Sequence, residues 1–320
     1  MKTKLAILLT TTFFTASIFA APQNKGELPV YKKTQTVSGT INSIGSDTMN
    51  NLMTLWAEAF AKFHPGVKVQ VEGKGSSTAP PALIAGTSQF GPMSRAMKSE
   101  EIDKFEKKFG YKPTAIKTSI DALAVYVNKD NPIKGLSLQQ LDAIFSKTRR
   151  GNHSEDIVNW GQVDLTGSWA QKAISLYGRN SASGTYGYFK EIALFKGDYK
   201  NTVKEQPGSA SVVQGVTEDK YGIGYSGIGY ITSGVRAVPL SKKTGEPAYA
   251  PDVENVSSKK YPLARFLYLY VNKAPGKELS PLVKEFLKFV LSKQGQDIVI
   301  KDGYMTLSPE LIQKELSKLQ

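Results

Sequence analysis

The 320-residue chain contains no cysteine. It can therefore form no disulfide, carry out no thiol chemistry and accept no lipid on a cysteine, the group that tethers many exported bacterial proteins. Histidine is nearly as rare: His64 and His153 are the only two, and their spacing does not suit a shared metal ion. We therefore expect neither a metal site nor a bound cofactor.

Signatures of enzymatic catalysis are also missing. No G-x-S-x-G elbow occurs, and neither histidine lies in a context that marks a catalytic base. Gly222, Gly224 and Gly227 match the spacing of a dinucleotide-binding loop, but no helix pattern follows them, so a strand and a turn fit better. We predict that the chain is not an enzyme. A phosphatase built on scattered carboxylates stays open, because such ligands leave no spacing signature.

The longest apolar run lies at the N-terminus. Lys2 and Lys4 precede residues 5–20, which end in small residues suited to signal-peptidase cleavage. The run is short for a membrane span, and a retained anchor helix is the alternative. We expect residues 1–20 to be a signal peptide and the polar residues 21–36 to be a flexible leader. The sequence thus predicts an exported, soluble, periplasmic protein that is not a lipoprotein.

Acidic residues are outnumbered. The chain has 28 Asp and Glu against 41 Lys and Arg, which gives a formal net charge of +13. Such an excess could serve nucleic acid, an acidic surface or small anions. The lysines are scattered and form no stripe interleaved with aromatic residues, and export argues against nucleic acid. We therefore expect a small anion as the ligand and no nucleic-acid partner.

Strand and helix patterns alternate along the chain. Apolar residues recur with helical spacing over 49–63, and alternation predicts a strand over 67–71. Ser137 and Gln140 form a capping box ahead of another helix. Further strands are predicted at 37–44, 122–127, 235–240 and 264–271. Alternating strands and helices indicate parallel sheets, and the length exceeds what one hydrophobic core usually organises, so we expect two α/β lobes.

Three glycine-marked, hydroxyl-rich turns stand just ahead of predicted helices. They are Gly-Ser-Asp-Thr at 45–48, Gly-Ser-Ser-Thr at 75–78 and Arg-Asn-Ser-Ala-Ser-Gly-Thr at 179–185. N–H groups at a helix start are unpaired and carry partial positive charge, so each turn could enclose part of an oxyanion. Arg179 adds a guanidinium. The turns predict an oxyanion receptor.

Four motifs occur in order along the chain: Gly-Ser-Asp-Thr-Met at 45–49, the turn at 75–78, Gln-Phe-Gly-Pro-Met-Ser-Arg at 89–95 and the turn at 179–185. With these motifs the chain resembles the substrate-binding proteins of Pst-type phosphate ABC transporters, which are type II periplasmic binding proteins. Each motif is weak alone, but four in order are specific. The resemblance runs from about residue 37 to the C-terminus. It implies two lobes, each a mostly parallel sheet flanked by helices, joined by two crossing strands.

The resemblance also implies a domain layout and a mechanism. The crossing strands would lie near 121–127 and 262–270, so that lobe 1 would contain residues 37–120 and 265–320 and lobe 2 residues 121–264. Inorganic phosphate would be clamped without water between the lobes. Closure would present the liganded, monomeric protein to an ABC transporter permease.

Site residues follow from the resemblance one by one. The phosphate ligands would be Ser46, Asp47, Thr48, Ser76, Ser94, Arg179, Ser183, Gly184 and Thr185, with Ser77, Arg95 and Asp121 as further candidates. Taken alone, Asp47 and the serines of the second turn could instead be helix N-caps. Arg179 could be a surface ion-pair residue, and Arg95 could pair with Glu100 or Asp103.

Two positions depart from the family pattern. Ser94 stands where many relatives have an aspartate that accepts the ligand's proton, and Ser181 where many have an aspartate that orients the arginine. A carboxylate acceptor separates phosphate, which carries a proton near neutral pH, from sulfate, which does not. Our hypothesis is that Asp47 takes over as acceptor, with Asp121 as the second candidate. Selectivity for another oxyanion stays open.

The main interpretation is high-affinity phosphate binding by lobe closure. One alternative is an extracellular adhesin or surface-assembly protein that keeps this scaffold and uses its polar leader for contacts. Another is an exported phosphatase of the same fold.

Overall fold

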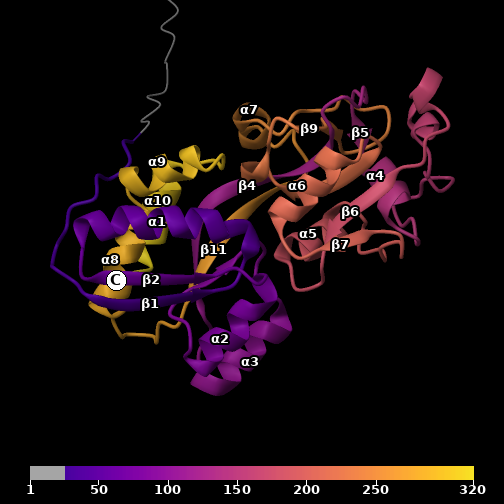
Figure 1. The fold of residues 1–320 in the computed structure, drawn as a ribbon. Helices are drawn as coiled ribbons and strands as arrows, with labels where there is room; N and C mark the ends of the chain where they lie inside the picture. Colours follow the sequence, from indigo (N-terminus) through magenta and orange to yellow (C-terminus); the bar gives the residue numbers. More distant parts are fainter. Residues whose placement is uncertain (1–25) are drawn as a thin grey trace, which may run out of the picture.

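The computed structural model describes residues 26–320; the predicted signal peptide and the first part of the predicted leader lie outside them. Figure 1 shows two lobes side by side, with strands β4 (Thr114–Asn128) and β11 (Ala264–Val271) running between them. Within residues 26–320 no helix combines the length and the apolar character needed to cross a membrane. The predicted α/β class, with two lobes joined by two strands, is confirmed.

The first lobe is built from both ends of the chain. Besides parts of β4 and β11, its elements are β1 (Gly39–Ile44), η1 (Asp47–Met49), α1 (Asn50–Phe63), β2 (Val67–Glu72), η2 (Ser76–Thr78), α2 (Ala79–Ala85), β3 (Gly91–Met93), α3 (Ser99–Phe109), α8 (Pro281–Val290), α9 (Lys293–Lys301) and α10 (Pro309–Ser317). β1 and β2 pair in parallel, and each runs into one of the hydroxyl-rich turns. The first two turns therefore lie at the same edge of a sheet.

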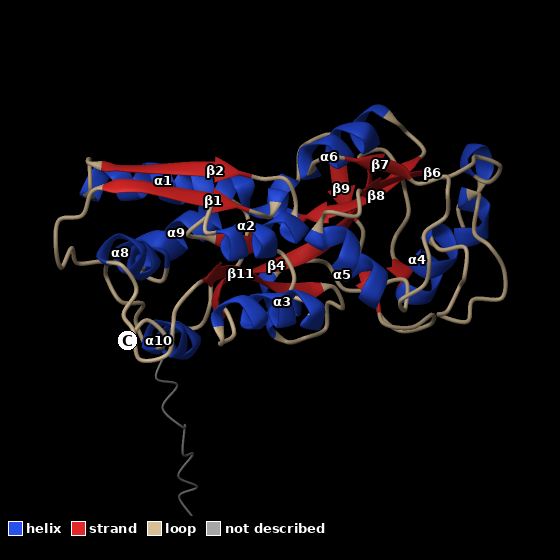
Figure 2. Cartoon of the chain, turned by 90° about the horizontal axis from the view of Figure 1, so that it is seen from below, coloured by secondary structure: helices blue, strands red, loops and turns tan. Residues whose placement is uncertain are grey.

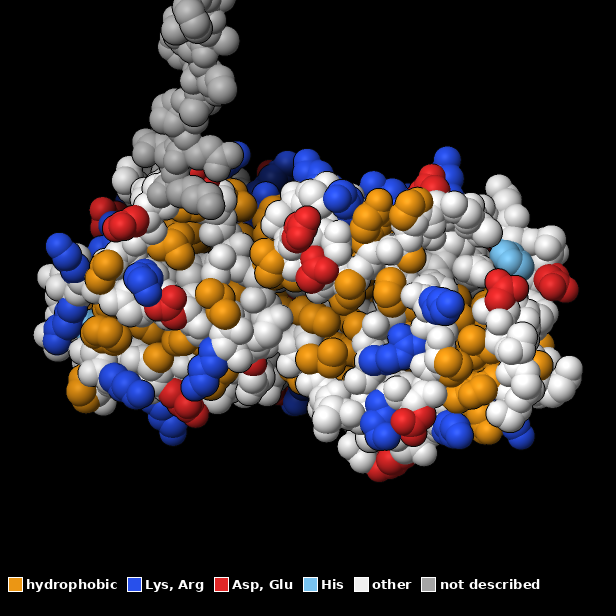
Figure 3. All heavy atoms as spheres, turned by 90° about the horizontal axis from the view of Figure 1, so that it is seen from above, with side chains coloured by type: hydrophobic (Ala, Val, Ile, Leu, Met, Phe, Trp, Pro, Cys, Tyr) orange, Lys and Arg blue, Asp and Glu red, His pale blue; other side chains and the backbone are white. Residues whose placement is uncertain are grey.

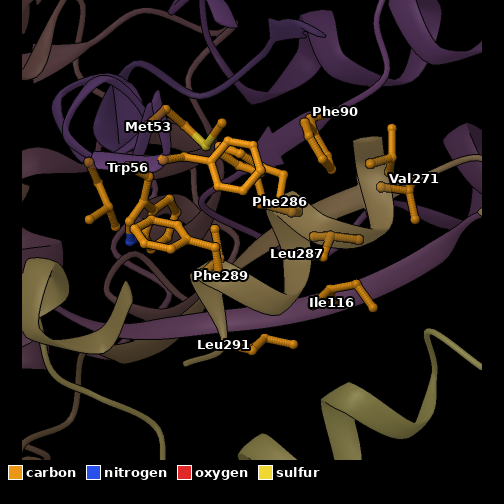
Figure 4. Packing of buried hydrophobic residues seen from close by; sticks show 14 of the residues in the cluster. Met53, Trp56, Phe90, Ile116, Val271, Phe286, Leu287, Phe289 and Leu291 are labelled. Atoms are coloured by element: carbon orange, nitrogen blue, oxygen red, sulfur yellow. The ribbon is translucent and has the colours of Figure 1, made fainter. Parts of the chain in front are cut away.

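Helical periodicity explains the core of this lobe. The apolar stripe of α1 includes Met53, Trp56 and Phe60, all fully buried. Figure 4 shows Met53 and Trp56 packed near Phe286 and Phe289 of α8, so helices from opposite ends of the chain share one core. Full burial of each such side chain stabilises the fold by about 1.5–3 kcal/mol.

The second lobe comes from the middle of the chain. Its elements are β5 (Leu136–Ser137), α4 (Leu138–Phe145), η3 (Trp160–Val163), η4 (Gly167–Trp169), β6 (Ser175–Arg179), α5 (Gly184–Ile192), β7 (Lys204–Gln206), α6 (Ser209–Glu218), β8 (Gly222–Gly227), η5 (Ile228–Tyr230), β9 (Val235–Ala237), β10 (Leu240–Ser241) and α7 (Val253–Ser257). The capping box is confirmed: Gln140 N donates to Ser137 Oγ at 3.1 Å, and Ser137 N donates to Gln140 Oε1 at 2.9 Å. The glycine triplet lies inside β8, as the strand interpretation required.

One mixed sheet connects the lobes. Its order is β3-β11-β4-β8-β6-β7, and β9 also pairs with β4. β6 pairs in parallel with β7 and β8, whereas β4 and β11 run antiparallel to each other and to their neighbours. Strand pairs away from the crossing strands are thus parallel, and every pair that includes β4 or β11 is antiparallel; Figure 2 shows the parallel pair β1 and β2 side by side. The predicted lobe boundaries stay a prediction.

The predicted flexible leader is wrong for the segment around Tyr31. This side chain is buried, and its hydroxyl donates to Glu285 Oε2 and lies 2.8 Å from His64 Nε2. Its main-chain N–H donates to Gln294 at 2.8 Å. The composition predicted a flexible segment because polar residues surround this single buried aromatic side chain. Its hydrogen-bond partners come from distant parts of the chain and are brought together only in the folded core. Burial also lowers the pKa of His64.

Candidate functional site

The three turns meet between the lobes. η1 and η2 carry the first two turns on the first lobe, and the third turn precedes α5 on the second. Thr48 Oγ1 lies 2.8 Å from Thr185 Oγ1, and Ser77 N donates to Ala182 O at 3.1 Å. Gly75 has a φ of 113°, and a Cβ there would lie 2.5 Å from Ala182 O, so only glycine allows this approach.

Ser76 and Ser94 lie directly against the start of α5. Ser94 N donates to Ser76 Oγ at 3.0 Å, and the two hydroxyl oxygens are 3.2 Å apart. A Cβ on Gly184, the first residue of α5, would collide with Ser76 Oγ and lie 2.6 Å from Ser94 Oγ. The glycine in the third turn therefore lets a helix N-terminus approach two hydroxyls of the other lobe.

Helix starts supply donors to this small space. Ser183 is the N-cap of α5 and accepts from Thr185 N at 3.1 Å. Ser46 is the N-cap residue of η1, but its side chain makes no capping bond. Its hydroxyl is buried without a hydrogen-bond partner among residues 26–320. A buried polar atom of this kind indicates a ligand or an ordered water, because native folds rarely leave such groups unpaired.

Arg179 ends β6 with its side chain only 1% exposed. Its Nη1 donates to Ser209 Oγ at 2.7 Å, and its Nη2 donates to Pro207 O at 3.2 Å. Nε is buried and has no partner in the described part of the chain. Burial lowers the pKa of Arg179 and Asp47 opposes this shift; the guanidinium nevertheless stays charged. The surface ion-pair alternative does not fit this buried position.

Asp47 supplies the carboxylate that Ser181 lacks. Ser181 is exposed, whereas Asp47 Oδ2 lies 3.1 Å from Arg179 Nη1, across the gap between the lobes. The side chain of Asp47 does not cap its own helix. Instead Oδ2 accepts from the N–H and the hydroxyl of Ser209, both at 2.8 Å. The N-cap alternative for Asp47 is therefore wrong.

Arg265 is the residue that sequence reasoning missed. It is buried and faces Asp121 across the crossing strands, with Nε and Nη2 at 3.0 and 2.7 Å from Asp121 Oδ2. Nη2 also donates to Thr185 Oγ1 at 2.8 Å. Asp121 Oδ1 accepts from Ile228 N at 3.0 Å. Asp121 is thus linked to the third turn through Arg265. The pairing of the two crossing strands, which places Arg265 opposite Asp121, was the feature from which Arg265 could have been found.

Arg95 and Ser77 lie at the rim. Arg95 binds Glu101 with two donors, at 2.7 and 2.6 Å, and its Nη2 donates to Ser77 Oγ at 3.3 Å. An acidic partner was predicted for Arg95, but it is neither Glu100 nor Asp103. Burial favours the neutral carboxyl of Glu101, yet the bonds from Arg95 and the Lys98 N–H lower its pKa.

A basic groove opens beside these rim residues. It measures about 430 Å³ and is lined by Ser77 and Ser183 of the turns and by cationic side chains that include Arg95, Lys98, Lys190 and Lys196. Among residues 26–320 no cluster of His, Asp and Glu could hold a metal ion. The arrangement can bind a small anion with hydroxyls, helix N-termini and one guanidinium.

Comparisons with known proteins agree with this chemistry. The model of the PBP superfamily domain matches residues 32–294. The chain is 53% identical over 316 residues to the phosphate-binding protein PstS of Pseudomonas aeruginosa, covering 98% of both chains. It is 31% identical to PstS of Staphylococcus haemolyticus, covering 87% of this chain and 84% of that one.

A solved structure gives the same picture. A putative phosphate ABC transporter substrate-binding protein with bound phosphate, from Clostridium perfringens, superimposes with a TM-score of 0.72 at 27% identity. The match covers 84% of this chain and all of the other.

Proposed function

The chain belongs to the PstS family of phosphate-binding proteins within the PBP superfamily, and from this premise we propose that it binds inorganic phosphate between its lobes and delivers it to an ABC transporter. The observation that carries the proposal is that two of the buried donors without a partner among the described residues, Ser46 Oγ and Arg179 Nε, belong to the glycine-marked turns. They belong to different lobes and both flank the meeting point of the three turns.

The ligand set is the one the sequence suggested. Phosphate oxygens would accept from helix-start N–H groups, from hydroxyls and from Arg179 Nε, and we propose these ligands: Ser46, Asp47 through its main chain, Thr48, Ser76, Ser94, Arg179, Ser183, Gly184 and Thr185. The further candidates would hold these ligands in place without contacting the phosphate; they are Ser77, Arg95 and Asp121. One lobe would contain residues 37–120 and 265–320, and the other residues 121–264. The lobes would close by rotating about β4 and β11.

Selectivity against sulfate needs an acceptor for the phosphate proton. Asp47 Oδ2 already accepts two hydrogen bonds from Ser209 and is paired with Arg179, and Asp121 is paired with Arg265, so neither carboxylate suits this role well. The hydroxyls of Ser76 and Ser94 can accept as well as donate. We assign the proton to them, and we expect discrimination against sulfate to be weaker than an aspartate at position 94 would give.

We further propose that the protein is a monomeric binding protein and not an enzyme. The two carboxylates described near the ligand, Asp47 and Asp121, are each paired with an arginine, which disfavours their use as a base that activates water. Basic side chains are scattered over the face that Figure 3 shows, which suits no nucleic acid. An exported, periplasmic and unlipidated protein fits the N-terminal run and the absence of cysteine. The adhesin and phosphatase alternatives are not favoured by the family.

Calorimetric titration tests the proposal. Mature protein, stripped of ligand by partial unfolding and dialysis, is titrated with phosphate and then with sulfate at neutral pH. We expect one phosphate per chain and a weak sulfate response, with Arg179→Met losing the phosphate heat while keeping its circular dichroism spectrum. Refolded protein that gives no phosphate heat, or that prefers sulfate, would falsify the assignment.

A further inference from the structure

Asp47 makes the densest set of contacts between the lobes at the candidate site. It belongs to η1 of the first lobe, and every donor to its side chain belongs to the second. Its main-chain oxygen also accepts from the hydroxyl of Tyr230, at 2.8 Å. Both its side chain and its main chain therefore bind across the gap that closure removes.

The carboxylate sits on the N-terminus of α6. Ser209 is the first residue of this ten-residue helix, and its N–H and hydroxyl both donate to Oδ2. Oδ1 faces the preceding residue, since a Cβ on Gly208 would lie 3.2 Å from it. The positive end of the helix and the Arg179 guanidinium thus both attract this negative charge.

These contacts turn Asp47 away from the anion. Oδ2 accepts two hydrogen bonds from Ser209 and is paired with the Arg179 guanidinium, so its lone pairs are occupied, and the other oxygen faces Gly208, just ahead of α6. The same contacts hold Arg179 Nη1, while Nε stays free of protein partners among residues 26–320. Ser209 and Pro207 hold the guanidinium from its own lobe, and Asp47 adds a charged partner from the other lobe that helps to fix the direction of Nε.

We propose that the Asp47 carboxylate is the latch that keeps the lobes closed over the bound anion and orients Arg179, and is not itself an anion ligand. The inference rests on the proposed phosphate binding and says which residue sets the lifetime of the closed state. In the open protein, Asp47 would be hydrated apart from Ser209 and Arg179, which bind each other on the second lobe. Closure joins them, so release of phosphate must first break the latch.

The test separates the association rate from the dissociation rate. Stopped-flow fluorescence with inorganic phosphate is measured for the wild type, for Asp47→Asn and for Asp130→Asn. Asp130 pairs with Lys129 on the surface and serves as the matched control. Loss of charge-assisted bonds should speed dissociation by about ten- to a hundredfold, with association changed less than about threefold. A direct ligand or an acceptor of the phosphate proton would instead lower association or change the ratio of phosphate to sulfate affinity.

A second variant reaches the latch from the opposite lobe. Ser209→Pro removes both the N–H and the hydroxyl at a first helical position, where proline is tolerated. It should speed dissociation as Asp47→Asn does, and small-angle scattering should show that phosphate contracts both variants less than the wild type. Wild-type dissociation and contraction in a folded Asp47→Asn protein would overturn the latch. Absence of phosphate binding by the wild type would overturn the proposed function instead, so the two failures are distinct.

Discussion

At the scale of single residues, the site depends on buried charges that hold one another. Arg179 is paired with Asp47, and Arg265 with Asp121, while Thr185 Oγ1 accepts from Arg265 and meets Thr48. The charge behind the third turn is thus as firmly held as the charge inside the site. Buried pairs of this kind add little net stability, but breaking one is strongly destabilising because the remaining charge loses its partner.

The pair of Asp121 and Arg265 can be tested by a double-mutant cycle. Arg265→Gln leaves the fully buried Asp121 without its cation and should lower the free energy of unfolding by about 3–5 kcal/mol. Adding Asp121→Asn should recover most of this loss, because no uncompensated charge is then buried. Urea unfolding followed by fluorescence measures each variant. A loss in the double variant equal to the sum of the losses in Arg265→Gln and Asp121→Asn would show that the pair is not coupled.

At the scale of elements, α5 carries the close approach between the lobes. Its first residue, Gly184, touches Ser76 and Ser94. A Cβ on Gly187, one turn later on the same helix, would meet only Arg95, at 3.6 Å. Helix propensity alone would favour alanine at both positions. Comparing the two positions therefore separates the need of the site for a residue without a Cβ from the tendency of a helix to favour alanine.

We predict that Gly184→Ala weakens phosphate binding at least about tenfold, because its Cβ must displace Ser76 and Ser94 and prevent full closure. Gly187→Ala is the matched control, and its affinity should stay within about twofold, since a 3.6 Å contact is ordinary. Calorimetry gives both affinities under identical conditions. Similar affinities for the two variants would contradict the tight approach at Gly184.

At the scale of the whole molecule, stability should depend on pH through Asp302. This carboxylate follows α9, accepts from Asn51 of α1 and has its pKa raised from 3.8 to about 6 by burial. The folded state therefore holds a proton that the unfolded state releases between these two values. The contribution to stability is greatest when the carboxyl is protonated, falls as the pH rises from 3.8 to about 6, and levels off above that.

Asp302→Asn removes this penalty while keeping an oxygen that can accept from Asn51. We expect the variant to melt at a higher temperature than the wild type at pH 7.5, where the wild-type carboxylate is ionised. The difference should shrink as the pH falls from 6 to about 4, because the wild-type carboxyl is then protonated in the folded state, and it should vanish only below 3.8, where the unfolded state is protonated as well. Differential scanning calorimetry at the two pH values measures it, and a gain that does not depend on pH would argue against Asp302.

Periodicity and turn chemistry predicted several of the elements, although the strand predicted at 235–240 is two short strands, β9 and β10. The strand predicted at 264–271 matches β11, and the apolar stripe of 49–63 forms the buried face of α1. These features are local, because spacing along a strand or helix decides which side chains share a face. The leader failed for the complementary reason: Tyr31 is ordered by His64, Glu285 and Gln294, which lie far along the chain.

The sequence by itself determined the chemistry of the site: three hydroxyl-rich helix starts, one arginine among them, no cysteine and no paired histidines. The tertiary structure decided which groups serve that chemistry together. It gave Arg179 its partner in Asp47, turned that carboxylate toward Ser209, and brought Arg265 behind Thr185. Helix starts and their donors follow from local sequence, whereas pairs between lobes depend on how two distant chain segments pack, which no local pattern encodes.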